Sequence, residues 1–421
     1  MTATSARSNR SLPTRSNPAS GPSKPFTRFC GIDVAKNKHV ACVLDQNGAF
    51  VARSASFNND AKGYELLLER LQKAGGQGRL IVAMEATGHY WYSLHDFLVR
   101  RGYSVVVLNP IQTAQQAKKG IRKCQTDAIN ARHIATLIKN GEHRPALVPG
   151  ELAMTCRQLT RLRYDLIHRT ARIKQTLWSR VHPVWPEYES LFKDPLGKTG
   201  RKLLMTAPTP ADVLALSEPE LNELLRKTSR GKFGPALTAK VRQSAEQTVG
   251  MRRGQEGIRI GIRALLNQIE ALRPIREQLE ADITALAGRL PAYILTLPGA
   301  DALKAASLFG ETDPIETFTS SSQLVAFAGL DPIVSESGEY KAPRRHISKR
   351  GSPFLRKTLW GMTLRALQQE GDLQSYWLRK RREGVHHLAA VTATAIKLCH
   401  VTWRILTDRR DYLPQRPATK P

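Results

Sequence analysis

The chain has 421 residues, with 64 Lys or Arg against 36 Asp or Glu, which gives a formal charge of +28 and an isoelectric point near 10.3. This length can hold two or three domains with cores of their own. Such an excess of positive charge goes beyond what solubility needs and indicates a polyanionic partner, nucleic acid by default. No run reaches the roughly 18 apolar residues of a membrane-spanning helix, and the N-terminus lacks an apolar signal-peptide core. We therefore expect a cytoplasmic, nucleoid-associated protein.

Five cysteines are scattered through the chain without a CxxC pair. Neither a zinc site nor a disulfide framework is expected from them, and they are interpreted as reduced, mostly buried thiols. Residues 1–26 are rich in Ser, Pro, Asn and Arg, a composition that predicts a disordered basic tail. The ordered part of the chain is therefore expected to begin near residue 27.

Alternating strand-like and helix-like patterns predict one α/β domain over residues 27–146. The expected strands are 29–36, 38–44, 49–57, 80–85 and 104–108, and the expected helices are 61–73, 90–101, 113–119 and 126–139. An Asn47-Gly48 pair marks a hairpin turn between the second and third strands. The domain is therefore expected to open with a three-stranded meander.

Three acids in this domain lie at the boundaries of predicted elements. Asp33 ends the first strand, Glu85 ends the fourth, and Asp127 opens the last helix. If the strands of Asp33 and Glu85 are parallel neighbours, their carboxylates meet at one end of the sheet, where they repel one another unless cations neutralise them. Mg²⁺ prefers oxygen ligands, and two such ions about 4 Å apart can hold the attacking and leaving oxygens of a phosphodiester. Asp33 alone also fits a turn or capping residue. The ordered set, however, is the layout of a ribonuclease-H-like nuclease fold.

Asn130 lies three residues after Asp127 and shares its helix face, where its amide oxygen could add a weaker metal ligand. His133 lies off this face and is interpreted first as a packing or nucleic-acid contact. A basic stretch just before Asp127 predicts a phosphate track beside the acids. The cations assigned to this track are Lys118, Lys119, Arg122 and Lys123.

Residues 147–290 are expected to form a basic helical and coiled-coil region. Residues 151–181 form one long amphipathic helix, whose basic side is assigned to the backbone of a duplex or a folded RNA. The assigned residues are Arg157, Arg161, Arg169 and Arg172. Residues 182–250 are predicted to be Pro-broken helices without assigned chemistry. Apolar residues over 262–290 keep a heptad spacing, interrupted near Pro274, that fits either a helix packed within the monomer or an intermolecular coiled coil.

A mainly helical third domain is expected over residues 291–410, with a tail at 411–421. It opens with Pro298-Gly299, a tight turn of the kind found in helix-hairpin-helix modules, which can present backbone N–H groups to a DNA phosphate. Further on, Ser337 stands in a loop rich in glycine and cations. Access and positive charge are what a phosphoryl-attacking nucleophile needs, and an ordinary Ser-Gly turn fits as well. The cations are Arg344, Arg345, Lys349, Arg350 and Arg356.

The motifs of the chain, taken in order, resemble the transposases of the insertion-sequence-110 family, which are related to the Piv-type DNA invertases. These motifs are Gly31-Ile32-Asp33-Val34-Ala35-Lys36, Met84-Glu85-Ala86-Thr87-Gly88, Thr126-Asp127-Ala128, Leu297-Pro298-Gly299, and Gly329-Leu330-Asp331-Pro332 through Ser337-Gly338 to Lys349-Arg350-Gly351. The resemblance implies a RuvC-like, ribonuclease-H-fold domain and a C-terminal transposase domain with a serine nucleophile. It also implies a DNA recombinase guided by a non-coding bridge RNA, whose middle helices bind RNA and assemble dimers or tetramers.

By this resemblance, Asp33, Glu85 and Asp127 match three of the four acidic metal ligands of the family. Ser337 matches the serine that attacks the DNA backbone and forms a covalent phosphoserine link. Asn130 stands where the fourth acid is expected. Three interpretations follow: Asn130 ligates directly, another acid substitutes for it, or this copy is impaired.

The predicted function is a Mg²⁺-dependent DNA recombinase that keeps the phosphodiester energy in a serine ester. Ser335 lies two residues before Ser337 and is an alternative nucleophile. A RuvC-like structure-specific endonuclease would use the same acids with water as the nucleophile. A catalytically decayed nucleic-acid-binding protein would bind in a salt-sensitive way without cleavage.

Overall fold

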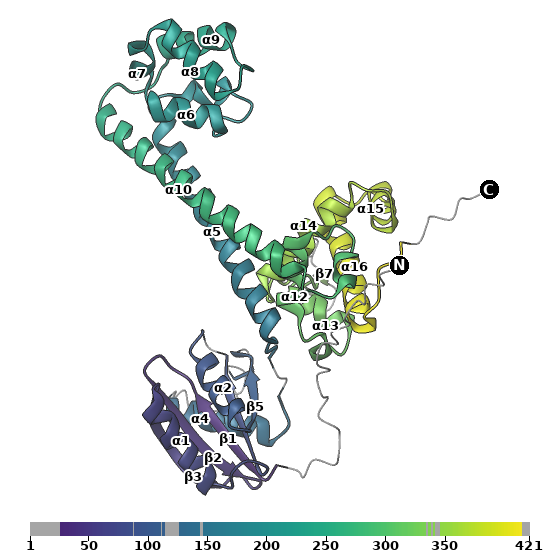
Figure 1. Ribbon diagram of the computed structural model, residues 1–421. Coiled ribbons are helices and arrows are strands. Elements are labelled where there is room, and N and C mark those ends of the chain that lie inside the picture. Colours follow the sequence, from purple (N-terminus) through teal and green to yellow (C-terminus); the bar gives the residue numbers. More distant parts are fainter. Residues whose placement is uncertain are drawn as a thin grey trace, which may run out of the picture. The chain divides into compact units, whose positions relative to one another are not determined.

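The computed structural model of the protein describes residues 26–86, 88–110, 112–113, 126–143, 146–333, 336–337, 340–341 and 346–414. The chain divides into two compact units, Met1–Val148 and Pro149–Pro421 (Figure 1). Several predicted features lie outside the described residues. They are the basic tail before residue 26, residues 114–119 of a predicted helix, Ser335, Lys118, Lys119, Arg122, Lys123, Arg344 and Arg345.

Five strands form one mixed sheet in the first unit. They are β1 (Arg28–Asp33), β2 (Lys38–Asp45), β3 (Phe50–Asn58), β4 (Leu80–Glu85) and β5 (Ser104–Leu108). The order across the sheet is β3-β2-β1-β4-β5; β2 runs antiparallel to both of its neighbours, whereas β1, β4 and β5 are parallel. All five predicted strands are confirmed, and the first ends at Asp33 rather than at residue 36.

Helices cover both faces of this sheet. Helices α1 (Ala61–Lys73) and α2 (Trp91–Arg100) share one core cluster with β1 and β4, built largely from leucines of the helices and apolar side chains of the strands. Helix α4 (Asp127–Lys139) packs on the other face, where Ile134 and its neighbours contact Ala83 and Leu108. The first unit is therefore an α/β domain of three layers, as the sequence predicts.

Helix α4 lies unusually close to β1 because β1 carries a glycine at the contact. A Cβ built on Gly31 would lie 2.1 Å from the carbonyl oxygen of Ala131 and 2.4 Å from the nitrogen of Ala135. No side chain fits in that space, so glycine permits the close backbone approach. This contact fixes how near the helix that begins at Asp127 comes to the strand that ends at Asp33.

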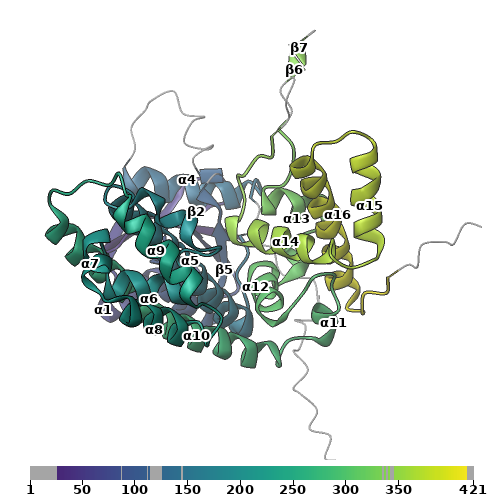
Figure 2. The ribbon, with the colours of Figure 1, turned by 90° about the horizontal axis from the view of Figure 1, so that it is seen from above.

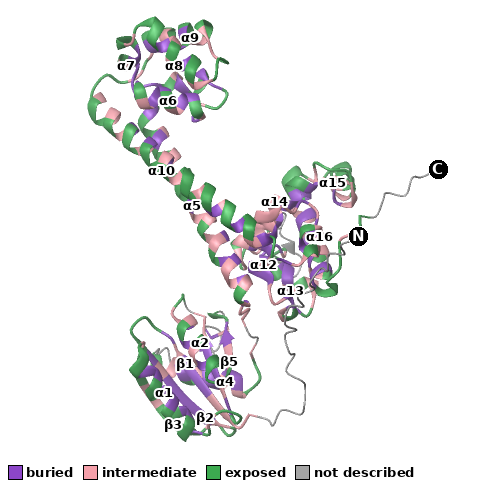
Figure 3. Ribbon diagram, viewed as in Figure 1, coloured by how far each residue is buried: buried purple, intermediate pink, exposed green. Residues whose placement is uncertain are grey.

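Two long helices run side by side in opposite directions through the second unit (Figures 1 and 2). These are α5 (Glu151–Val181) and α10 (Gln255–Ala287), the latter with Pro274 inside it. The predicted helix at 151–181 is confirmed at both ends. Helix α10 packs against α5 within the chain, and the heptad residues Ile262, Ile269, Leu279 and Ile283 are buried. An intermolecular coiled coil stays a prediction. Figure 3 shows how much of this helix pair is exposed along its length.

The segment between these two helices folds into a compact cap at one end of the pair (Figure 1). It contains the 3₁₀ helix η1 (Pro186–Leu191) and helices α6 (Lys198–Thr206), α7 (Pro210–Ala215), α8 (Glu218–Thr228) and α9 (Pro235–Glu246). Trp185 and Tyr188 are fully buried at its centre, and the hydroxyl of Tyr188 donates to Gly200 O at 2.7 Å. The cap therefore has a core of its own.

The rest of the second unit is helical apart from one short ribbon. Its helices are α11 (Ala292–Leu295), α12 (Ala302–Thr312), η2 (Ile315–Thr317), α13 (Ser321–Ala328), α14 (Pro353–Ala366), α15 (Asp372–Arg382) and α16 (His387–Asp408), and the ribbon pairs β6 (Glu336–Ser337) with β7 (Tyr340–Lys341). A Cβ on Gly299 would lie 2.0 Å from Met362 O, so the predicted Pro-Gly turn packs directly on α14. Among the described helices, none is long and apolar enough to cross a membrane.

Candidate catalytic site

The acids at the ends of β1 and β4 lie side by side. These strands are parallel neighbours with Ile32 opposite Met84, which places Asp33 and Glu85 at the same end of the sheet. Helix α4 begins at Asp127 and is capped by Thr126, whose Oγ1 accepts from the nitrogen of Ile129 at 3.3 Å. The parallel pairing and the helix start that the sequence predicts are both confirmed.

The carboxylate of Asp33 is affected by burial, by Asn130 and by the two other acids. Burial raises the pKa of Asp33, the hydrogen bond from Asn130 opposes that rise, and the charges of Asp127 and Glu85 raise the pKa further. The amide Nδ2 of Asn130 donates to Asp33 Oδ2 at 3.0 Å. A half-desolvated carboxylate repelled by two others favours a proton or a cation beside it.

Glu85 is held by a residue that the sequence did not single out. The hydroxyl of Thr113, which is buried, lies 2.6 Å from Glu85 Oε2 and donates to it. Thr113 follows the Asn109-Pro110 stop of β5, and no local pattern marks it as a partner of an acid 28 residues earlier. Thr113 therefore fixes the orientation of one predicted ligand.

The donor atoms around Asp33 are suited to a hard divalent cation, because they are carboxylate, amide and hydroxyl oxygens. Within the described ranges, no three His, Cys, Asp or Glu side chains come close enough together to hold a metal ion. An amide can present either its NH₂ group or its oxygen, so Asn130 can serve Asp33 as a donor or a cation as a ligand. Burial, and then the charge of Arg132, lowers the pKa of His133. Its interpretation as a packing or nucleic-acid contact stays a prediction.

Ser337 lies in the ribbon of the second unit, where it is paired with Tyr340. Main-chain hydrogen bonds close the base of this ribbon: the nitrogen of Ser348 donates to Asp331 O at 2.8 Å, and that of Lys349 to Gly329 O at 3.1 Å. The described residues on either side of the ribbon therefore form a defined frame.

Two glycines of the same motif make this frame compact. Gly329 has φ of +64°, and a Cβ on Gly351 would lie 1.9 Å from Phe327 O. Arg356 Nη1 donates to Ala328 O at 2.9 Å, so this predicted nucleic-acid contact also braces the frame. Lys349 and Arg350 are exposed beside it.

Behind the frame lies a fully buried carboxylate, Glu311 of α12. Arg161 of α5 donates to it from Nε at 2.7 Å and from Nη2 at 3.0 Å. Ser352, the N-cap of α14, donates to Glu311 Oε2 at 2.9 Å. Glu311 thus connects α12, α5 and the start of α14.

This arrangement corrects one nucleic-acid assignment. Arg157 is buried, and its Nε donates to Gly310 O at 2.8 Å. The prediction that Arg157 contacts a phosphate is wrong, because its guanidinium is turned into the protein. Arg161 is half-exposed, but two of its donors are already bound to Glu311. Arg169 and Arg172 are exposed, and their assignment stays a prediction.

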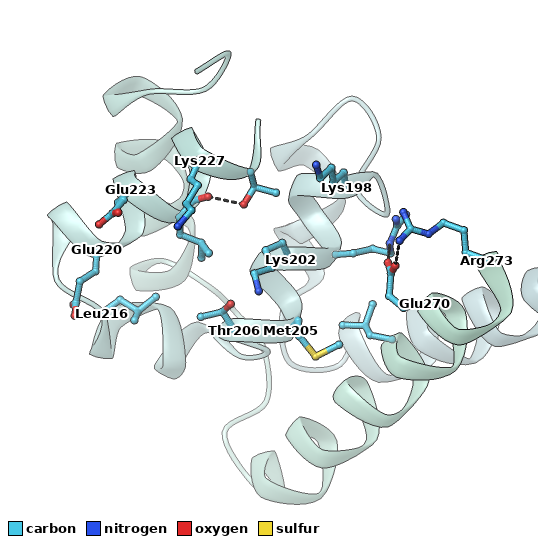
Figure 4. A pocket seen from close by; sticks show the side chains of 14 residues that line it. Lys198, Lys202, Met205, Thr206, Leu216, Glu220, Glu223, Lys227, Glu270 and Arg273 are labelled. Atoms are coloured by element: carbon cyan, nitrogen blue, oxygen red, sulfur yellow. Dashed lines mark hydrogen bonds and ion pairs between the residues drawn. The ribbon is translucent and has the colours of Figure 1, made fainter. Parts of the chain in front are cut away.

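A cavity of about 740 Å³ opens in the cap between α6, α8 and α10 (Figure 4). Its lining combines apolar side chains such as Met205 with charged ones, among them Glu270, which pairs with Arg201 at 2.8 Å and Arg273 at 3.1 Å. None of the site residues predicted from sequence lines it. The cavity is therefore separate from the acids and from the serine.

Two family models match the chain in order. A model described as "Transposase" matches residues 30–186, and one described as "Transposase IS116/IS110/IS902 family" matches residues 292–378. The uncharacterized 44.8 kDa protein of insertion element IS116 from Streptomyces clavuligerus is 27% identical over 405 residues, covering 93% of this chain and 98% of that protein.

Two shorter similarities point the same way. The transposase for insertion sequence element IS1111A from Coxiella burnetii is 34% identical over 153 residues, 35% of this chain and 41% of that protein. The pilin gene-inverting protein of Moraxella lacunata is 32% identical over 96 residues, 22% of this chain and 29% of that protein. With both family models matched in order and a relative similar along nearly its whole length, this chain belongs to the insertion-sequence-110 (IS110) family of DNA transposases.

Proposed function

We propose that this transposase exchanges DNA strands with two groups of residues, the acids Asp33, Glu85 and Asp127 of the first unit and Ser337 of the second. The observation that carries the proposal is geometric: Asp33 and Glu85 end parallel neighbouring strands at the same end of the sheet, and Asn130 of the helix that begins at Asp127 donates to Asp33. Like charges placed near the half-buried Asp33 carboxylate disfavour its charged form unless a cation is bound beside it. A RuvC-like, ribonuclease-H-type fold is supported by the strand order β3-β2-β1-β4-β5 with β2 antiparallel to its neighbours.

Each residue of the first group has a defined part. Asp33, Glu85, Asp127 and Asn130 would hold one or two Mg²⁺ ions through oxygen atoms, with Thr113 fixing Glu85. When bound, Mg²⁺ supplies Lewis-acid activation of the scissile phosphate. The carboxylates need fixed positions for this, and the close packing of α4 on Gly31 supports such a fixed arrangement.

Ser337 would act as the nucleophile of the strand exchange. Its Oγ forms a bond to phosphorus while the bond from phosphorus to one strand oxygen breaks, and the departing strand takes up a proton as a free hydroxyl. Attack by the hydroxyl of another strand reverses these steps and releases Ser337. No external energy is needed, because each step exchanges one phosphate ester for another.

The partners proposed for this chemistry are the DNA of the element ends and the target, a non-coding guide RNA, and further copies of the chain in a dimer or tetramer. The similarity to a pilin gene-inverting protein supports DNA recombination. The exposed cations Arg169, Arg172, Lys349 and Arg350 support contacts to nucleic-acid backbones.

The experiment that tests this function looks for a covalent adduct between the protein and labelled element-end DNA on a denaturing gel, with Mg²⁺ and the RNA that flanks the element. We expect an adduct with the wild type and with Ser335→Ala, and none with Ser337→Ala. Nucleic-acid binding should persist in all three, which controls for folding. Nicked DNA without any adduct would instead indicate a nuclease that uses water.

Asn130→Asp tests the position where the family is expected to have its fourth acidic metal ligand and this chain has Asn130. The variant loses the hydrogen bond that lowers the pKa of Asp33 and adds a fourth carboxylate beside it. We expect a lower melting temperature without Mg²⁺ and a larger rise on adding Mg²⁺ than in the wild type, measured by differential scanning fluorimetry. Greater recombination in this variant would identify the wild type as an impaired copy. Unchanged or lower recombination would tell against an impaired site in the wild type.

A further inference from the structure

The chain leaves the sheet directly after Asp33. Asp33 and Val40 are the last residues paired between β1 and β2, and the first residues of β2 pair with β3 on the other side. Residues 34–37 therefore form a turn outside the β1–β2 ladder (the Asp33 turn). The polar backbone groups of such a turn need partners elsewhere in the protein.

His39 and Asn59 supply these partners. Nδ1 of His39 accepts from the nitrogen of Ala35 at 3.2 Å. Asn59, which directly follows β3, donates from Nδ2 to Lys36 O at 3.1 Å and from its main-chain nitrogen to Asn37 O at 2.9 Å. Three successive residues of the Asp33 turn are therefore each hydrogen-bonded to a residue outside the turn.

The two side chains that hold the turn are themselves fixed. His39 is fully buried, with its ring centroid 5.2 Å from that of Phe57 and 6.2 Å from that of Tyr64 in α1. Burial lowers the pKa of His39, which favours the neutral imidazole that can accept at Nδ1. The hydroxyl of Tyr64 donates to Asn59 Oδ1 at 2.5 Å, which directs the NH₂ group of Asn59 to the turn.

The Asp33 turn and the Asp33 carboxylate are linked through Val34, the first residue of the turn. Side chains alternate across the sheet, so Ile32 and Val34 join the core cluster shared with α1, whereas Asp33 accepts from Asn130 of α4. Burial raises the pKa of Asp33, and hydrogen bonds from Asn130 and from the backbone of Val34 lower it. A shift of the turn would therefore move a donor of this carboxylate.

We propose that Asn59 and His39 are positioning residues for the strand exchange: they hold the Asp33 turn so that the Asp33 carboxylate keeps its place among the acids. Tyr64 acts through Asn59. This inference rests on the proposed function, in which Asp33 is a metal ligand. Residues that orient a metal ligand without touching the ion typically change metal affinity or activity by 10- to 100-fold when they are replaced.

The first test follows hydrogen–deuterium exchange of the full chain without Mg²⁺ or DNA. We expect Asn59→Ala to speed exchange over residues 34–37 and to leave β4 and α4 unchanged. His39→Phe keeps a ring in the core but removes the acceptor, and should speed exchange over the same residues. The matched control is Asn58→Ala, which changes the neighbouring, exposed asparagine. Exchange that is faster across the whole first unit in Asn59→Ala would show a general role in the fold and overturn the inference.

The second test records the melting temperature of the full chain as Mg²⁺ is added. We expect the half-maximal rise to need roughly tenfold more Mg²⁺ in Asn59→Ala than in the wild type or in Asn58→Ala. DNA affinity without Mg²⁺ should be equal in all three proteins. The same Mg²⁺ requirement in Asn59→Ala and the wild type would contradict the positioning role. A wild type without any response to Mg²⁺ would instead contradict the metal site of the proposed function and, with it, the role of Asn59.

Tyr64→Phe tests whether Tyr64 acts through Asn59. It removes the hydroxyl that orients the Asn59 amide and keeps the ring beside His39. We expect a smaller increase in the Mg²⁺ requirement than in Asn59→Ala, and no further increase when the two changes are combined, because both break one chain of hydrogen bonds. Increases that multiply in the double variant would show that Tyr64 acts independently and would remove it from the proposal.

Discussion

Replacing Asp33 by Asn is expected to abolish strand cleavage while leaving the first unit at least as stable as in the wild type. The carboxamide has almost the same shape as the carboxylate, but it removes one of three mutually repelling charges from a half-desolvated position. Stability should therefore not fall, whereas loss of an anionic metal ligand should bring strand cleavage below detection. Cleavage assays and thermal unfolding of the same preparation measure both effects.

The difference in stability between Asp33→Asn and the wild type depends on pH in a defined direction. The pKa of Asp33 in the folded chain is raised, so between its ordinary value near 3.8 and the raised value the folded state binds more protons than the unfolded state. Stability contributed by Asp33 is therefore present at acidic pH and is lost as the pH rises through this window. Asp33→Asn does not titrate, so its advantage in melting temperature should be visible at neutral pH and vanish at acidic pH.

Mg²⁺ supplies the control for this prediction. Added Mg²⁺ should raise the melting temperature of the wild type, a chelator should reverse that rise, and Asp33→Asn should respond to neither. A variant that is less stable at neutral pH and still cleaves DNA would show that Asp33 is an ordinary turn residue, as a single Asp at a strand end usually is.

The strands, helices and element boundaries that could be predicted from sequence are those that depend on local residue patterns. Apolar runs ending in an acid placed Asp33 and Glu85 at strand ends, and the Thr-Asp pair placed Asp127 at a helix start. The periodicity of α5 defined a helix of 31 residues without error at either end. Parallel pairing of β1 and β4 then followed from the expected fold rather than from either strand alone.

The parts that could not be predicted depend on side chains far apart in sequence. Arg161 meets Glu311 across 150 residues, and Thr113 reaches Glu85 across 28. An arginine on an amphipathic helix looks the same in sequence whether its guanidinium faces solvent or a buried acid.

Glu311→Gln is expected to destabilise the second unit by roughly 3 kcal/mol, because it breaks a buried ion pair by removing one partner. In the wild type, Glu311 is fully buried and accepts two hydrogen bonds from Arg161 and one from Ser352. The variant would place an amide NH₂ group beside the Arg161 guanidinium, which donates two hydrogen bonds to the carboxylate in the wild type. Urea unfolding monitored by circular dichroism measures the loss.

The matched control is Glu316→Gln, which removes an acid paired with Arg409 at 2.8 Å on the surface of the same unit. Both partners there are more than half exposed, so no measurable change in stability is expected. Because Ser352 caps α14 directly after the frame of the serine ribbon, Glu311→Gln should also lower the yield of protein–DNA adduct under conditions where the unit remains folded. If Glu311→Gln and Glu316→Gln unfold at the same urea concentration, Glu311 does not connect these helices in solution. A destabilised Glu311→Gln that still forms adduct at the wild-type level would show that the connection supports the fold without positioning the serine.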